Sequence, residues 1–123
     1  MTETMANDRE HIEFDQINGL IAAAGVDGTR EIVDAFWRST IQLGDALAAQ
    51  VNEGALDAAA KTAHAIKGSA ANIGAARLSD SAAMIEIACR ENDAAKAAAL
   101  VAEFQENFDV LKATLDDHLR KSA

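Results

Sequence analysis

Residues 56–74 have the sequence LDAAAKTAHAIKGSAANIG, and they decide the fold because they form one uninterrupted helical pattern. Alanine, the residue with the highest helix propensity, fills much of the stretch, and apolar side chains recur at steps of three and four residues. That apolar stripe consists of Ala59, Ala63, Ile66, Ala70 and Ile73. The spacing predicts a helix that begins near Leu56, buries one face and ends at Gly74, since glycine is typical of helix C-termini.

The same periodicity predicts helices on both sides of this stretch. Upstream, a short amphipathic helix begins after residue 11, where Asp15 is placed to cap it, and ends at Gly25. A longer helix begins at residues 27–29 and ends near residues 52–54, with a core stripe of Ile32, Val33, Phe36, Thr40, Leu43, Leu47 and Val51. Downstream, a helix over about residues 77–91 buries Leu78, Ala82, Ile85 and Cys89. Asn92 and Asp93 separate it from a last helix that buries Leu100, Phe104, Phe108, Leu111, Leu115 and Leu119.

These elements indicate an all-α protein. The chain has 123 residues, no proline, and only 4% aromatic residues, which leaves room for one core and argues against a sheet. Short connections between long helices favour antiparallel neighbours. We therefore expect an antiparallel up-down-up-down four-helix bundle over residues 12–121, with the short extra N-terminal helix across one end and residues 1–11 as a flexible tail.

Charge and cysteine content exclude several classes of function. Eleven basic residues against 20 acidic ones give a formal net charge of -9, which repels nucleic acid and anionic membrane surfaces. The single cysteine, Cys89, cannot form an internal disulfide, which favours a reducing compartment. The polar first ten residues lack the apolar segment of a secretory signal, and no apolar run is long enough to span a membrane. We expect a cytoplasmic protein with no nucleic-acid or membrane partner.

His64 is the residue that a plain helical bundle does not explain. At about 100° per residue, its side chain lies opposite Ile66 and Ile73 and must point away from the core. Apart from Asp57, the residues on the same face are small or basic, and we expect a flat partner-docking surface made of Ala60, Lys61, Gly68, Ala71 and Ala75.

Gly68 and the local charge support a chemical role for this face. A glycine inside a helix costs about 1 kcal/mol relative to alanine, so a chain so rich in alanine has a reason to omit the methyl group here. Residues 58–79 contain Lys61, Lys67 and Arg77 and no acid, a cationic segment in an acidic protein. A neutral imidazole is a competent nucleophile, and a lysine one turn away can balance the charge of a phosphoryl group.

The segment His64-Ala65-Ile66-Lys67-Gly68 resembles the His-x-Leu-Lys-Gly motif of histidine phosphotransfer (HPt) domains, with isoleucine in place of the usual leucine. The resemblance covers about residues 13–119 and extends to Leu78, Glu86 and Arg90 on the next helix. It implies a phosphorelay intermediate in which His64 accepts a phosphoryl group from the aspartate of one receiver domain and passes it to another. The implied partners are receiver domains of a hybrid histidine kinase and a response regulator.

The resemblance also implies that the chain is a cosubstrate and not an enzyme. A start methionine close to the bundle, with no kinase or receiver sequence attached, favours a free-standing shuttle, and we expect a monomer. No glycine-rich phosphate loop or nucleotide motif is present, so catalysis would come from the partner. We expect no cofactor or metal bound by this chain, because no histidine or carboxylate pair near His64 has ligand spacing. The partner receiver would supply Mg²⁺.

Three more side chains have candidate roles beside His64. Lys67 is expected to stabilise charge on the phosphoryl group. Glu86 is placed to accept the second imidazole proton, or it simply pairs with Arg90 one turn later. Ser69 either supports the site or bonds back to its own helix.

The alternative function is a non-catalytic helical adaptor that binds a partner through the small-residue face around His64. It explains the bundle and the smooth face but not the need for a histidine. A di-iron or haem bundle would need inward-facing carboxylate and histidine pairs, which the sequence lacks.

Overall fold

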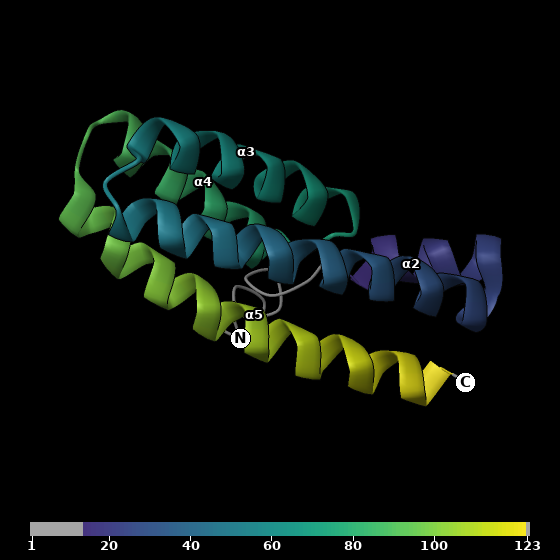
Figure 1. Ribbon diagram of the computed structural model, residues 1–123. Coiled ribbons are helices and arrows are strands. Elements are labelled where there is room, and N and C mark those ends of the chain that lie inside the picture. The colour runs from purple at the N-terminus through teal and green to yellow at the C-terminus, as the bar shows by residue number, and fades with distance from the viewer. Residues whose placement is uncertain (1–13, 123) are drawn as a thin grey trace.

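The computed structural model describes residues 14–122, and the regular secondary structure in that range is helical throughout. The helices are α2 (Phe14–Asn52), α3 (Leu56–Asn72), α4 (Ala76–Arg90) and α5 (Ala94–Ser122) (Figure 1). Turns of three residues join successive helices, so each helix runs antiparallel to the one before it. Contacts pass from α2 to α3, to α4, to α5 and back to α2, which closes a four-membered ring. The predicted all-α antiparallel bundle is therefore confirmed.

A break at Gly25 divides α2 into two arms. Gly25 has φ 79° and ψ 170°, a left-handed backbone conformation that favours glycine. The break confirms the predicted end of the short first helix, and residues 14–24 fold back beside the bundle (Figure 1). Asp15 lies within the first described turn, and the expected flexible tail, residues 1–11, falls outside the described residues.

Two contacts fasten the short arm to the bundle. The Ile17 side chain is fully buried in the core. The Gln16 side-chain amide donates hydrogen bonds to the carbonyl oxygens of Ala71 and Asn72 at 3.2 and 2.6 Å. These carbonyls belong to the last turn of α3, where the hydrogen bonds within the helix end, and the Ala71 carbonyl also accepts from the Gly74 amide. The short arm thus caps the helix that carries His64.

The C-terminus of α3 ends in a glycine turn, as the sequence predicts. Gly74 has φ 80°, its amide bonds to the Ala71 carbonyl, and the Ala75 amide bonds to the Ala70 carbonyl. This is the Schellman arrangement, in which the residue after the glycine turns back toward the helix. The turn directs the chain into α4 and fixes the separation of the two helices at this end.

The core follows the predicted stripes with two differences on α2. Ile32, expected in the core, is 41% exposed, because Val33, Phe36 and Thr40 occupy the side of α2 that faces the other helices. Trp37 was not part of the predicted stripe but is buried, and its ring packs edge-on against Phe36 and Phe108. Trp37 lies beside the apolar stripe of α2, and its indole ring is large enough to extend from there into the core.

None of the helices described over residues 14–122 combines the length and the apolar character needed to cross a bilayer.

Candidate functional site

His64 projects from α3 on the side away from the core. Its side chain is 65% exposed. The nearby residues Ala63 and Ile66, which belong to the core stripe, are fully buried. The outward direction predicted from helical periodicity is therefore confirmed. The ring does not stand alone, because Nδ1 lies 3.2 Å from Oε1 of Glu86 on α4.

Glu86 is a buried carboxylate that three cationic or polar side chains share. Its Oε1 contacts His64 Nδ1 and lies 3.2 Å from Lys67 Nζ, so both partners from α3 meet one oxygen. Its Oε2 accepts hydrogen bonds from Nε and Nη2 of Arg90 at 3.1 and 3.0 Å. The sequence left two interpretations open, a contact with the imidazole or a pair with Arg90, and the structure contains both contacts.

The surroundings of Glu86 keep it ionised. Burial alone raises the pKa of a carboxyl group, but hydrogen bonds from Arg90, Lys67 and His64 outweigh burial and lower the pKa of Glu86 from 4.5 to about 2. A carboxylate can only accept hydrogen bonds, so its contact with His64 favours the tautomer with hydrogen on Nδ1. That tautomer leaves the lone pair of a neutral ring on Nε2.

Gly68 lies one turn after His64 on the exposed face of α3. A Cβ atom built there meets no other atom within 4 Å, and the backbone is ordinary helix. Nothing in the described chain therefore requires a glycine at this position.

Two of the residues expected in the docking surface are buried instead. Ala60 is 1% exposed because α3 packs against both α2 and α4, so its buried arc is wider than a single stripe. Ala75 is fully buried because α3 has already ended, and the turn after Gly74 points this residue inward. Neither can form a contact surface. Lys61, Gly68 and Ala71 are exposed and remain available.

Two polar residues without a signal in the sequence hold the helix that carries His64. Ser79 of α4 donates its hydroxyl hydrogen to the carbonyl oxygen of Lys67 at 3.1 Å, which joins the two helices beside the site. Gln16, described above, binds the C-terminal carbonyls of α3. Both contacts connect different helices, so no periodicity within one helix signals them. Ser69, which the sequence assigns either to the site or to a bond within its own helix, is half-buried on α3.

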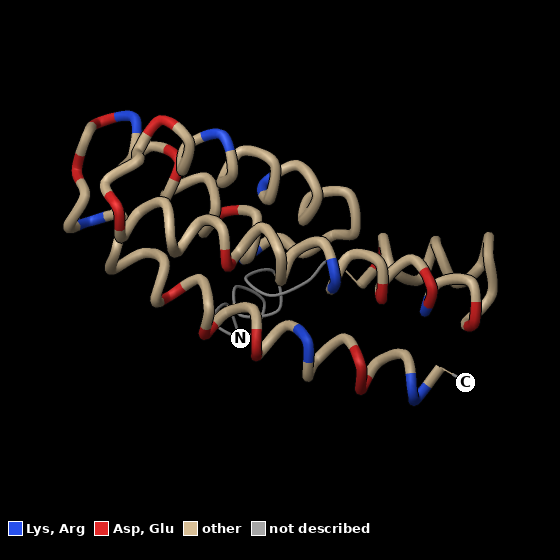
Figure 2. The backbone as a smooth tube through the Cα atoms, viewed as in Figure 1, with Lys and Arg blue, Asp and Glu red and all other residues tan. Residues whose placement is uncertain are grey.

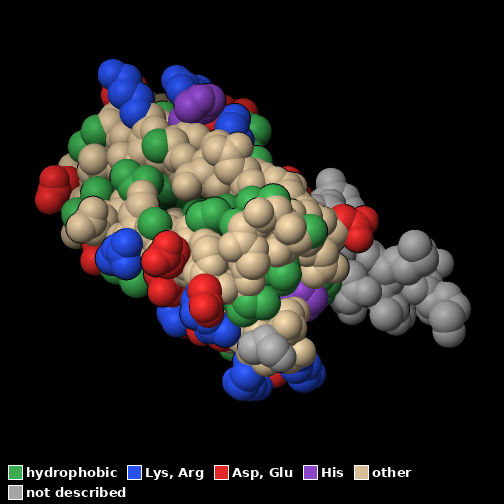
Figure 3. Space-filling model, turned by 90° about the vertical axis from the view of Figure 1, so that its right-hand side faces the viewer, with side chains coloured by type: hydrophobic (Ala, Val, Ile, Leu, Met, Phe, Trp, Pro, Cys, Tyr) green, Lys and Arg blue, Asp and Glu red, His purple; other side chains and the backbone are tan. Residues whose placement is uncertain are grey.

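Two of the three basic residues of the predicted cationic segment lie with His64 on α3, whereas the third, Arg77, lines a hollow between α4 and α5. Lys61 and Lys67 lie on α3, and Arg90 joins them from α4, whereas acidic positions are common along α2 and α5 (Figure 2). Basic side chains gather beside a histidine at the edge of the bundle where α3 and α4 lie (Figure 3). Within residues 14–122, no group of three or more His, Cys, Asp or Glu side chains is arranged to hold a metal ion.

Comparisons with known proteins identify the family. The Hpt domain family model matches residues 31–117, more than half of the chain. The structure is similar to the crystal structure of the histidine-containing phosphotransfer protein MtHPt2 from Medicago truncatula, with a TM-score of 0.82 and 20% sequence identity, over 97% of this chain and 83% of that chain. At this identity the similarity shows a shared fold, and no curated protein matches the sequence. Because the family match includes both helices of the His64–Glu86 site, the chain belongs to the Hpt family of histidine phosphotransfer domains.

Proposed function

We propose that this protein is a phosphorelay intermediate that receives a phosphoryl group on His64 from the aspartate of one receiver domain and delivers it to the aspartate of another. Receiver domains of a hybrid histidine kinase and of a response regulator are the proposed donor and acceptor. The observation that carries the proposal is an exposed imidazole whose Nδ1 is held by a buried carboxylate.

The transfer step follows from that arrangement. The lone pair on Nε2 attacks the phosphorus of the receiver's aspartyl phosphate, a P–N bond forms, and the P–O bond to the aspartate breaks. The aspartate leaves as a free carboxylate, and the ring, which keeps its hydrogen on Nδ1, becomes positively charged. Glu86 is placed to stabilise that charge through the same contact that orients the ring. The reverse sequence delivers the phosphoryl group to the second receiver.

Lys67 has a proposed role on the phosphoryl oxygens. Its Nζ lies 3.2 Å from Glu86 Oε1, and its side chain is 37% exposed, so the ammonium is close to the imidazole and can still move. A phosphoryl group on Nε2 would bring negative oxygens to the same surface, where the ammonium can neutralise part of their charge. Mg²⁺ bound by the receiver neutralises these oxygens during transfer, and this chain is not proposed to bind it.

In this function the chain carries a phosphoryl group and does not catalyse its transfer. One imidazole takes up one phosphoryl group, and the receiver supplies the groups that activate the acyl phosphate. We therefore expect stoichiometric labelling that depends on the receiver.

The decisive experiment is incubation with a phosphorylated receiver domain and Mg²⁺. We expect label on the chain that is labile in acid and stable in base, as a phosphoramidate is, and that maps to His64 by mass spectrometry. The variant His64→Gln should fold, because the side chain is exposed, and should take up no label. Labelling of His64→Gln at the parent level would show that another residue is the acceptor. Absence of label with every receiver tried would instead support the adaptor function.

A further inference from the structure

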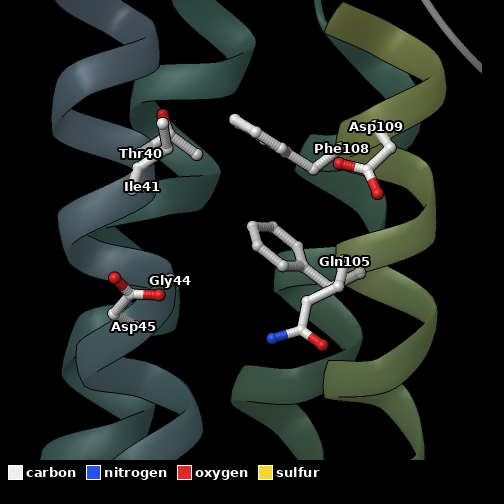
Figure 4. Close-up of a pocket in the computed structure, with 8 residues that line it drawn as sticks. Thr40, Ile41, Gly44, Asp45, Gln105, Phe108 and Asp109 are labelled. Atoms are coloured by element: carbon white, nitrogen blue, oxygen red, sulfur yellow. The ribbon is translucent and has the colours of Figure 1, made fainter.

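We propose that the groove between α2 and α5 is a docking site for a basic protein segment that inserts one apolar side chain. The groove has a volume of about 160 Å³ and opens on the surface between the two helices (Figure 4). It lies between α2 and α5, whereas His64 and Glu86 lie on α3 and α4. In the ring of helix contacts these two pairs are opposite each other, so an occupant of the groove leaves the phosphotransfer site open.

The interior of the groove is apolar. Phe104 and Phe108 of α5 line it, together with Ile41 of α2, an exposed apolar residue. Figure 4 shows the Phe108 ring pointing from α5 toward α2. Gly44 contributes no side chain, and a Cβ atom there would lie 3.5 Å from Cε2 of Phe104. The missing side chain thus leaves room opposite the phenyl ring. A volume of this size matches one leucine or phenylalanine side chain, since a cavity of about 150 Å³ accepts a benzene ring.

The rim of the groove is acidic and determines the charge of the occupant. Asp45 of α2 and Asp109 of α5 both line it, both are exposed, and no lysine or arginine belongs to the lining. A second copy of this chain would bring like charges to the rim and carries a net charge of -9, which opposes self-association through this face. A partner with lysine or arginine on both sides of an apolar residue is complementary to both aspartates.

Thr40 is the buried polar residue in the lining of the groove. It lines the groove and is 1% exposed, and its hydroxyl finds no hydrogen-bond partner among the described residues. Figure 4 shows its side chain on the side of α2 that faces Phe108. The hydroxyl oxygen is itself buried, so a backbone group of an inserted segment could pair with it only after the Thr40 side chain rotates toward the groove.

The single tryptophan of the chain offers a direct measurement of occupancy. Trp37 packs against Phe108 with ring centroids 5.4 Å apart, so an inserted side chain that moves Phe108 alters the surroundings of the indole. The probe is the capped peptide acetyl-Arg-Leu-Leu-Arg-amide, titrated into the full chain and followed by tryptophan fluorescence and by NMR of the Gly44 amide. Matched peptides with glutamate in place of arginine, and with alanine in place of leucine, serve as controls.

We expect saturable shifts with the basic leucine peptide, at least tenfold weaker binding of both control peptides, and weaker binding as salt is raised. The double variant Asp45→Asn/Asp109→Asn should weaken binding at least fivefold. The double variant Asp57→Asn/Asp80→Asn removes the same charge from α3 and α4 and should leave binding unchanged. Gly44→Ala fits the backbone without a clash and narrows the groove, so it should weaken binding while the protein stays folded.

Two results would overturn the proposal. The first is the absence of saturable binding by the basic leucine peptide. The second is equal binding by all three peptides or equal loss in the two double variants, which would show general attraction to an acidic protein. Neither result bears on phosphotransfer, because the measurement uses no receiver and no phosphoryl group.

Discussion

Glu86 is the residue that links the two helices of the site, since its two oxygens divide three partners between them. Arg90 occupies Oε2 from the same helix, while Oε1 receives His64 and Lys67 from α3. Glu86 is only 8% exposed. Burying its negative charge to this extent would cost much more free energy if fewer cations surrounded it. The pair with Arg90 and the contact with the imidazole are therefore parts of one arrangement.

The tautomer of His64 should depend on the acceptor at position 86. In Glu86→Ala the hydrogen on Nδ1 loses its acceptor, so we expect a mixture of the two neutral tautomers where the parent has one. Nitrogen chemical shifts of the imidazole at alkaline pH distinguish the two forms. Glu86→Gln keeps an oxygen acceptor and is the matched control, which should retain more of the parent tautomer. An unchanged spectrum in Glu86→Ala would show that Glu86 does not set the tautomer of His64 and only forms salt bridges with Lys67 and Arg90.

Lys67 should matter for transfer and little for folding. We expect Lys67→Ala to slow phosphoryl transfer by about 10- to 100-fold, equivalent to about 1.4–2.7 kcal/mol of transition-state stabilisation. Its melting temperature should change little, because Glu86 keeps Arg90 as a partner. Transfer rates over a range of receiver concentrations test this, and Lys96→Ala, which removes an exposed lysine of α5 outside the docking surface, controls for net charge. Equal effects of the two substitutions would assign both to general electrostatic attraction.

Among the elements, α3 shows most clearly what its sequence predicts and what it does not. Helical periodicity alone places His64 outward and Ile66 inward. The same projection fails at Ala75, because it assumes that the helix continues past Ile73. The contact between His64 and Glu86 depends on how α3 and α4 align, and that alignment follows from packing and from the turn at Gly74. Periodicity within one helix carries no such information, so from sequence the pairing was a hypothesis that rested on the rim position of Glu86 and the family resemblance.

Gly68 should show opposite effects on stability and on function. Gly68→Ala has open space around its new methyl group and should stabilise the protein by up to about 1 kcal/mol. Gly68→Gln should fold at least as well as the parent but lose receiver docking, because its side chain stands beside the imidazole, where in-line transfer tolerates little displacement. Urea unfolding and transfer assays on the series glycine, alanine, glutamine measure both quantities. Transfer that is insensitive to side-chain size would place the docking face elsewhere.

The break in α2 makes a second prediction about an element. Gly25→Ala forces an alanine into a positive-φ conformation and should destabilise the protein by about 1–2 kcal/mol. Gly19→Ala is the control, since Gly19 lies in the helical part of the same arm with nothing within 4 Å of its Cβ position, and this change should stabilise slightly. Urea denaturation of both variants measures the difference. Equal stability changes would mean that the two arms of α2 can join without a break.

At the scale of the whole molecule, Glu86 should make stability depend on acid. Its folded pKa of about 2 lies below its ordinary value of 4.5, so its contribution is fully present above about pH 4.5 and is lost as the pH falls toward 2. The shift corresponds to an upper bound of about 3 kcal/mol. The stability difference between the parent and Glu86→Gln should therefore shrink through this window in urea unfolding. Asp117→Asn is the comparison: the pKa of Asp117 is also lowered, chiefly by a hydrogen bond from Lys121, but its side chain is 41% exposed and solvent screens the pair, so its stability difference should change much less over this window. A difference that stays constant with pH would contradict the assignment.

The buried alanines of α3 have a consequence for how this protein can change over evolutionary time. Ala59, Ala63 and Ala70 are fully buried and let the neighbouring helices approach α3 closely. Replacing one of them with a larger apolar residue would leave the hydrophobic pattern intact, and bundles tolerate such growth by moving helices apart. The distance between His64 Nδ1 and Glu86 Oε1 is already 3.2 Å, however, so moving α3 and α4 farther apart would break this hydrogen bond. Neutral drift at hidden positions is therefore expected to erode the chemistry of the site well before it erodes the fold.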